Sequence, residues 1–217
     1  MTPSEEIKLV KVYNDYFRVK YENSKWESLG RLLEYNITGN KVSLNCKHGN
    51  LYLYVISDTV IRIQSEIEGK VTLPSFALSE TVMAPAELTY IENEFFIKLK
   101  TKKIVIEIIK DPIRIVIKNE FGEILNSDFE KGIFFNKEFV KCEKELPQNE
   151  MFYGFGEKTG PFQKRGTKMF MWNTDYPNLD SKSDPAYKSI PFFIGLNNGK
   201  AYGIFYDTPS WSCFDMG

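Results

Sequence analysis

Histidine is almost absent from this chain, and cysteine is scarce. The sequence has one histidine, His48, and three widely separated cysteines, Cys46, Cys142 and Cys213. A single histidine gives little support for a metal site or for a histidine-based catalytic triad. An odd number of cysteines without CxxC spacing argues against a disulfide framework or a zinc site. We therefore predict no metal, no cofactor, and a reducing, cytoplasmic location.

Long apolar runs and an excess of either charge are also missing. Lysine and arginine number 28 and aspartate and glutamate 29, so the net charge is −1. That balance provides no overall attraction to nucleic acid or to an anionic membrane. No run approaches the roughly 18 apolar residues of a membrane helix, and the polar, acidic N-terminal residues predict no secretion signal. We expect neither nucleic-acid nor membrane partners, while homo-oligomerisation is left open.

Alternation of apolar and polar residues dominates the first two thirds of the chain. For example, Ile104, Ile106 and Ile108 share one face, with Lys103 and Glu107 on the other. This pattern is typical of antiparallel strands that bury one face. Turns at 39–40, 58–59 and 101–102 predict hairpins, and turn signals about every 8–12 residues favour a sandwich or barrel. We predict an all-β chain, with 25–33 its most helix-tolerant stretch and 74–85 a long loop.

The last third of the chain has no such period. Glycine, aromatic and charged residues are interleaved in four runs: Tyr153-Gly-Phe-Gly-Glu-Lys158, Lys164-Arg-Gly166, Trp172-Asn-Thr-Asp175 and Tyr187-Lys-Ser-Ile-Pro-Phe192. Segments of this kind are shaped loops, and binding residues concentrate on such loops. The glycines do not form a dinucleotide-binding loop, because Gly160 stands one residue late for that spacing. Nor is this a phosphate loop, because Glu157 occupies the position that requires glycine.

In order and spacing, these four runs resemble the end of the N-terminal domain of glycoside hydrolase family 31, the α-glucosidase and α-xylosidase family. The resemblance implies one large antiparallel two-sheet β-sandwich over residues 1–217, of the galactose-mutarotase-like (supersandwich) type, that stops before a catalytic (β/α)8 barrel. It further implies retaining hydrolysis of terminal α-linked glucose by two aspartates of that barrel. The implied partners are this barrel and an α-glucoside or oligosaccharide substrate. The 217-residue chain would then hold no catalytic residue and be inactive alone.

A loop at about residues 169–189 is the candidate substrate-pocket element. A sugar site combines aromatic faces with acceptor oxygens, because sugars present hydroxyls around a partly apolar ring. The loop supplies both types in Trp172, Asp175, Tyr176, Asp180, Asp184 and Tyr187. By residue type alone Asp175 could equally cap a turn, but the resemblance implies that it contacts sugar hydroxyls. We predict that Trp172 and Tyr187 pack and shape the loop. Glu157 and Arg165, on either side of the Gly160-Pro161 turn, should make a structural ion pair or hydrogen bonds to the backbone of that turn.

Three alternatives remain. Relatives that resemble α-xylosidases tend to carry Asp-Gly-Gly after the Trp-Asn-x start, whereas this chain continues Asp175-Tyr-Pro, which looks more like the α-glucosidase form. A stand-alone carbohydrate-binding sandwich is the second alternative; against it, a strand at 201–206 is followed only by the start of its return. A mutarotase-like epimerase is the third, and it needs a histidine and a carboxylate for proton transfer at the anomeric carbon. His48 lies in a predicted turn, which argues against it.

Overall fold

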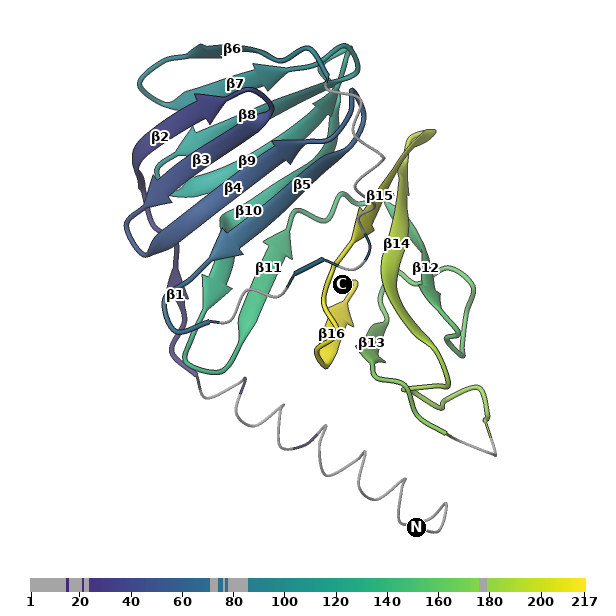
Figure 1. Cartoon of the computed structure of the whole chain (residues 1–217). Helices are drawn as coiled ribbons and strands as arrows, with labels where there is room; N and C mark the ends of the chain where they lie inside the picture. The colour runs from purple at the N-terminus through teal and green to yellow at the C-terminus, as the bar shows by residue number, and fades with distance from the viewer. Residues whose placement is uncertain are drawn as a thin grey trace. The chain divides into compact units, whose positions relative to one another are not determined.

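The computed structural model describes residues 15, 21, 24–70, 74–75, 77, 86–175 and 179–217. The regular secondary structure of the described residues is almost entirely β-strand, and every strand pair is antiparallel, which confirms the all-β prediction. It divides into two compact units, a sandwich unit at Lys25–Glu145 and a loop unit at Leu146–Gly217 (Figure 1). Whether residues 1–217 form one domain stays a prediction.

The sandwich unit contains two antiparallel sheets. The four-stranded sheet has the order β2-β3-β4-β5, and the seven-stranded sheet has the order β1-β10-β9-β8-β7-β6, with β11 paired to β10. The strands of the first are β2 (Leu32–Thr38), β3 (Lys41–Cys46), β4 (Gly49–Val55) and β5 (Ile61–Glu66). Those of the second are β1 (Glu27–Ser28), β6 (Thr89–Glu92), β7 (Phe96–Lys100), β8 (Ile104–Lys110), β9 (Ile113–Asn119), β10 (Ile124–Phe135) and β11 (Val140–Lys144).

One core lies between these two sheets. Alternate residues of β3 and β4, such as Leu44 and Leu53, are buried against alternate residues of β7, β8 and β9, such as Ile106 and Ile108. The side-chain period of a strand is two residues, so each strand turns one apolar set to the core and a polar set to solvent. The three predicted hairpins are present as β2–β3, β4–β5 and β7–β8. The two-sheet sandwich is therefore confirmed for this unit.

Two further predictions have different outcomes. The most helix-tolerant stretch, 25–33, forms β1 and the first residues of β2, because pairing with β10 and β3 overrides a weak helical preference. The predicted loop at 74–85 lies largely outside the described residues. In the part of the chain that the structure describes, no helix has the length and apolar character to cross a membrane.

The loop unit has two small sheets around an aromatic core. One sheet has the order β12-β14-β15, from β12 (Met151–Gly156), β14 (Ser189–Asn197) and β15 (Lys200–Phe205). The other pairs β13 (Lys168–Met171) with β16 (Ser212–Asp215). Phe155 is fully buried at the centre, with ring centroids 5.2 Å from those of both Phe193 and Phe214.

The Tyr-Gly-Phe-Gly run owes its composition to this packing. Gly154 has a φ of +124°, and a Cβ there would come within 2.7 Å of the Phe192 carbonyl oxygen on β14. Glycine is the residue that accepts both this conformation and so close a backbone approach. Phe155, the next residue, then enters the core. The run that marks the resemblance is therefore a strand-packing element of the loop unit.

Candidate functional site

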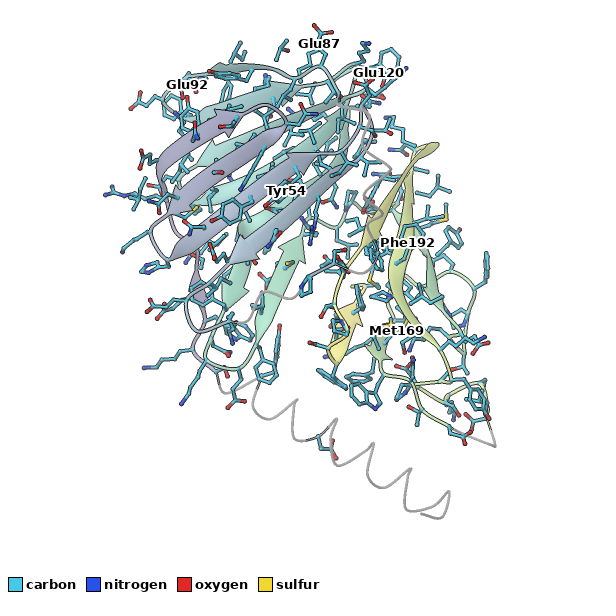
Figure 2. The ribbon with its side chains drawn as sticks, viewed as in Figure 1. Tyr54, Glu87, Glu92, Glu120, Met169 and Phe192 are labelled. Carbon is cyan, nitrogen blue, oxygen red and sulfur yellow. The ribbon has the colours of Figure 1, made fainter. Side chains whose placement is uncertain are left out.

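The candidate loop connects β13 to β14, and its two ends are joined at a neck. Met169 on β13 and Phe192 on β14 mark the strands that lead into and out of it (Figure 2). The Asp184 carboxylate accepts a 2.6 Å hydrogen bond from the Phe170 backbone N–H. It also forms an ion pair with Lys158, with 2.8 Å between Oδ1 and Nζ. Lys158 Nζ also donates to the Phe170 carbonyl. Only 2% of the Lys158 side chain is exposed, so this is a buried, charge-assisted clamp.

Three further hydrogen bonds hold the loop: one comes from Thr159, which precedes β13, and two join the arms of the loop to each other. The Thr159 hydroxyl donates to the Ser183 carbonyl at 2.6 Å. The Thr174 backbone N–H donates to the Ala186 carbonyl at 3.2 Å, and the Ser189 N–H donates to the Asn173 side-chain oxygen at 2.8 Å. Residues 173–174 on one arm and 183–189 on the other are thus held in place.

Two of the candidate carboxylates, Asp184 and Asp180, accept hydrogen bonds from other groups of the loop. Asp184 belongs to the neck. Asp180 accepts hydrogen bonds from the Lys182 backbone N–H at 2.8 Å and from the Ser183 hydroxyl at 2.9 Å. The hydrogen bond from the Lys182 backbone N–H, and then the one from the Ser183 hydroxyl, lower the pKa of Asp180. Such an arrangement is a side-chain-capped turn, so neither carboxylate is the best candidate for a ligand.

Asp175 is different. It is exposed, and its carboxylate makes no hydrogen bond or ion pair with any residue that the structure describes. The preceding residue, Thr174, is 9% exposed and tied to Ala186. The described structure therefore offers Asp175 no turn to cap and leaves both of its oxygens open to a ligand. Its contact with sugar stays a prediction.

The two predicted packing aromatics lie at the loop surface. Half of the Trp172 side chain is exposed, as is 41% of Tyr187. Tyr187 lines a shallow depression of about 360 Å³ with Glu157, Lys158, Thr159, Leu179 and Ala186. An aromatic ring beside a carboxylate is a suitable surface for a sugar. The predicted loop-shaping role of Trp172 and Tyr187 stays a prediction.

Comparison with known proteins decides the family. Residues 50–215 match the family described as the glycosyl hydrolase 31 N-terminal galactose mutarotase-like domain. This chain belongs to that family. It is 31% identical over 190 residues to α-glucosidase 2 of Bacillus thermoamyloliquefaciens, a match that covers 87% of the chain and 24% of the relative. It is 38% identical over 84 residues to an α-xylosidase of Emericella nidulans, covering 38% of the chain and 10% of the relative.

Solved structures include a similar domain. The chain superposes on the Flavobacterium johnsoniae family 31 dextranase complexed with isomaltotriose with a TM-score of 0.80 and 31% identity. The match covers 88% of this chain and 24% of the dextranase. The chain therefore spans about a quarter of the length of α-glucosidase 2 and of the dextranase.

Arg165 and Glu157, the two charged residues beside the Gly160-Pro161 turn, have partners within the protein. Arg165 donates from Nη1 to the carbonyls of Pro147 and Glu150 at 2.8 and 2.9 Å, so its partners are backbone groups at 147–150 and not those of the predicted Gly160-Pro161 turn. Glu157 lies 4.0 Å from Lys188 Nζ, and both side chains are largely exposed. Such a surface pair contributes about 0–1 kcal/mol.

The Lys158–Asp184 clamp was missed by the sequence analysis. Lys158 and Asp184 are 26 residues apart, and the local pattern around Lys158 does not distinguish it from the exposed lysines nearby. Asp184 was noted only as one of several acceptor residues. The available signal was a lysine next to a buried glycine–aromatic turn, because a buried ammonium requires a counter-charge.

Proposed function

We propose that this family 31 domain is the N-terminal part of an α-glucosidase-like enzyme that hydrolyses terminal α-linked glucose with retention. The observation that carries the proposal is the 31% identity to α-glucosidase 2 over 87% of the chain. A catalytic barrel outside residues 1–217 would supply the nucleophile and the acid/base, two carboxylates about 5–5.5 Å apart in retaining enzymes. Residues 1–217 alone should have no hydrolase activity.

The domain's contribution to the reaction would be positional. The sandwich unit would support the barrel, and the 169–189 loop would form one wall of the substrate pocket. The open carboxylate of Asp175 could accept hydrogen bonds from two sugar hydroxyls at once. Fixing the sugar relative to the reacting carboxylates lowers the entropic barrier to reaction. The substrate class is an α-glucoside or an oligosaccharide with such an end.

Asp175→Ala in the full-length enzyme tests the pocket role. A hydrogen bond to a charged group is worth about 1.5–3 kcal/mol, which corresponds to a loss of about 10–150-fold in kcat/KM. Asp180→Ala is the matched control, because Asp180 caps a turn of the same loop. An Asp175→Ala loss no greater than the control's, or a loss explained by unfolding, would refute a pocket role.

An α-xylosidase is the second candidate, because the Emericella nidulans α-xylosidase is 38% identical over 84 residues. The continuation Asp175-Tyr-Pro in place of Asp-Gly-Gly supports the glucosidase. The ratio of kcat/KM for an aryl α-glucoside to that for the matching α-xyloside decides between them. A ratio below one would favour the xylosidase.

We also propose a cytoplasmic location, supported by the three cysteines, which are free in the described structure. Fractionation of the source cells, followed by immunodetection in each compartment, would test it. Detection outside the cytoplasm would contradict the proposal. Homo-oligomerisation stays open.

A further inference from the structure

We propose that Lys158 and Asp184 are positioning residues that set where Asp175 is presented to substrate. The inference rests on the proposed function, since it assigns Asp175 a place in the sugar pocket. It adds two residues that would govern substrate binding by fixing the backbone of the loop.

The first step of the argument is the geometry of the neck. Phe170 lies on β13, opposite Cys213 of β16. Its N–H donates to Asp184, and its carbonyl accepts from Lys158. These two side chains thus satisfy backbone groups that a further strand would otherwise take, and they do so at the edge of a two-stranded sheet. Asp184 lies in the later part of the loop, shortly before β14 begins at Ser189. The clamp therefore joins the beginning of the loop, at Phe170, to its later part.

The second step is electrostatic. A second buried lysine, Lys164, is 5% exposed and donates to the Thr159 carbonyl at 3.0 Å. Burial lowers the pKa of Lys164, the charge of Lys158 lowers it further, and the charge of Asp184 opposes both. Asp184 is therefore the counter-charge that faces both ammonium groups. A buried ion pair with additional hydrogen bonds has one favoured geometry, and removing one partner leaves a buried charge uncompensated.

The third step connects the clamp to Asp175. Thr174 is tied to Ala186, two residues after Asp184. Asp175 follows Thr174 directly and has no hydrogen bond of its own to the described residues. The place of its carboxylate is therefore set by backbone that the neck holds. A displacement of about 1 Å of a positioning group can lower the rate on the order of 10²-fold. A loosened neck should therefore lower kcat/KM.

The experiment is a double-mutant cycle in the full-length enzyme with an aryl α-glucoside. Lys158→Met removes the ammonium and keeps an unbranched apolar chain, and it should lower kcat/KM by about tenfold. In an Asp175→Ala background, Lys158→Met should change kcat/KM by less than about twofold. The effect should be this small because the carboxylate that Lys158 positions is absent. Lys158→Arg, which keeps the charge, should restore part of the loss. Lys168→Met, an exposed lysine on β13, should be silent.

The outcomes separate the inference from the proposed function. Equal losses from Lys158→Met with and without Asp175 would overturn the positioning role, even if Asp175→Ala itself lowers kcat/KM. No effect of Asp175→Ala would overturn the pocket role, and the inference with it. If Lys158→Met does not fold, Thr159→Val removes only the tie to Ser183 and should show the same dependence on Asp175. Hydrogen exchange over 171–183 should rise in each neck variant; unchanged exchange there would also overturn the inference.

Discussion

Replacing Tyr202 by phenylalanine should destabilise the loop unit in a pH-dependent way. Glu150 directly precedes β12 and is 2% exposed. Its carboxylate accepts a 2.7 Å hydrogen bond from the Tyr202 hydroxyl. Burial raises the pKa of Glu150, while the Tyr202 hydrogen bond and the charge of Arg165 oppose that rise. Tyr202→Phe removes the donor and leaves a buried carboxylate with one partner fewer.

The size and sign of the effect follow from these contacts. A hydrogen bond to a charged group contributes about 1.5–3 kcal/mol, so the loss should approach about 2 kcal/mol where Glu150 is ionised. The pKa of Glu150 in the folded state lies above the ordinary value of a glutamate side chain, so folding favours the protonated form. The stability from Glu150 is thus present below the unfolded pKa and lost as pH rises through the folded pKa. Because the Tyr202 bond limits that loss, Tyr202→Phe should matter least in acid and most at neutral pH.

Urea denaturation of the 217-residue chain, followed by tryptophan fluorescence at about pH 4 and about pH 8, measures this difference. Glu150→Gln keeps an acceptor for Tyr202 but cannot ionise, so Tyr202→Phe in that background should lose its pH dependence. Tyr90→Phe, at a tyrosine that is 52% exposed, should stay within about 0.5 kcal/mol of wild type. The same Tyr202→Phe loss at both pH values would refute the assignment of the effect to the Glu150 charge.

Three other outcomes are expected. Gly195→Ala would place a Cβ 2.4 Å from the Tyr202 ring; this overpacking should destabilise by about 1–3 kcal/mol in denaturation, and a Tyr202→Ala background should relieve most of it. Ile106→Ala, at a fully buried position, should lower the free energy of unfolding by about 2–5 kcal/mol, against less than about 0.5 kcal/mol for Ile124→Ala at a position 57% exposed. Burial raises the pKa of Cys46 to about 11, so mass spectrometry should find it unalkylated in the native chain near neutral pH and alkylated in denaturant; rapid native labelling would contradict its burial.

The sandwich unit could be predicted from sequence because its information is local. Alternation along β3, β4 and β8 names the buried face of each strand, and turn residues at 39–40 and 58–59 mark the hairpins. Pairing of adjacent strands then leaves few other arrangements. The helix-tolerant stretch at 25–33 shows the limit of this reasoning, since the partner of β1 is β10, far along the chain.

Residue type and family resemblance located the candidate loop, but they did not predict the hydrogen bonds and ion pairs that hold it. The residue types indicated that acidic and aromatic residues gather between 172 and 187, and the family resemblance singled out Asp175 among them. Neither could indicate that Asp180 caps a turn, that Asp184 pairs with a lysine 26 residues earlier, or that Asp175 keeps an open carboxylate.

Composition and alternation determined the strands and their buried faces, because those properties depend on neighbours along the chain. The fate of each charged side chain was decided by tertiary structure. Lys158, Glu150 and Asp184 look like solvated surface residues in the sequence. They are costly to bury unless a partner is brought to them, and only folding brings together partners that lie 26 and 52 residues away.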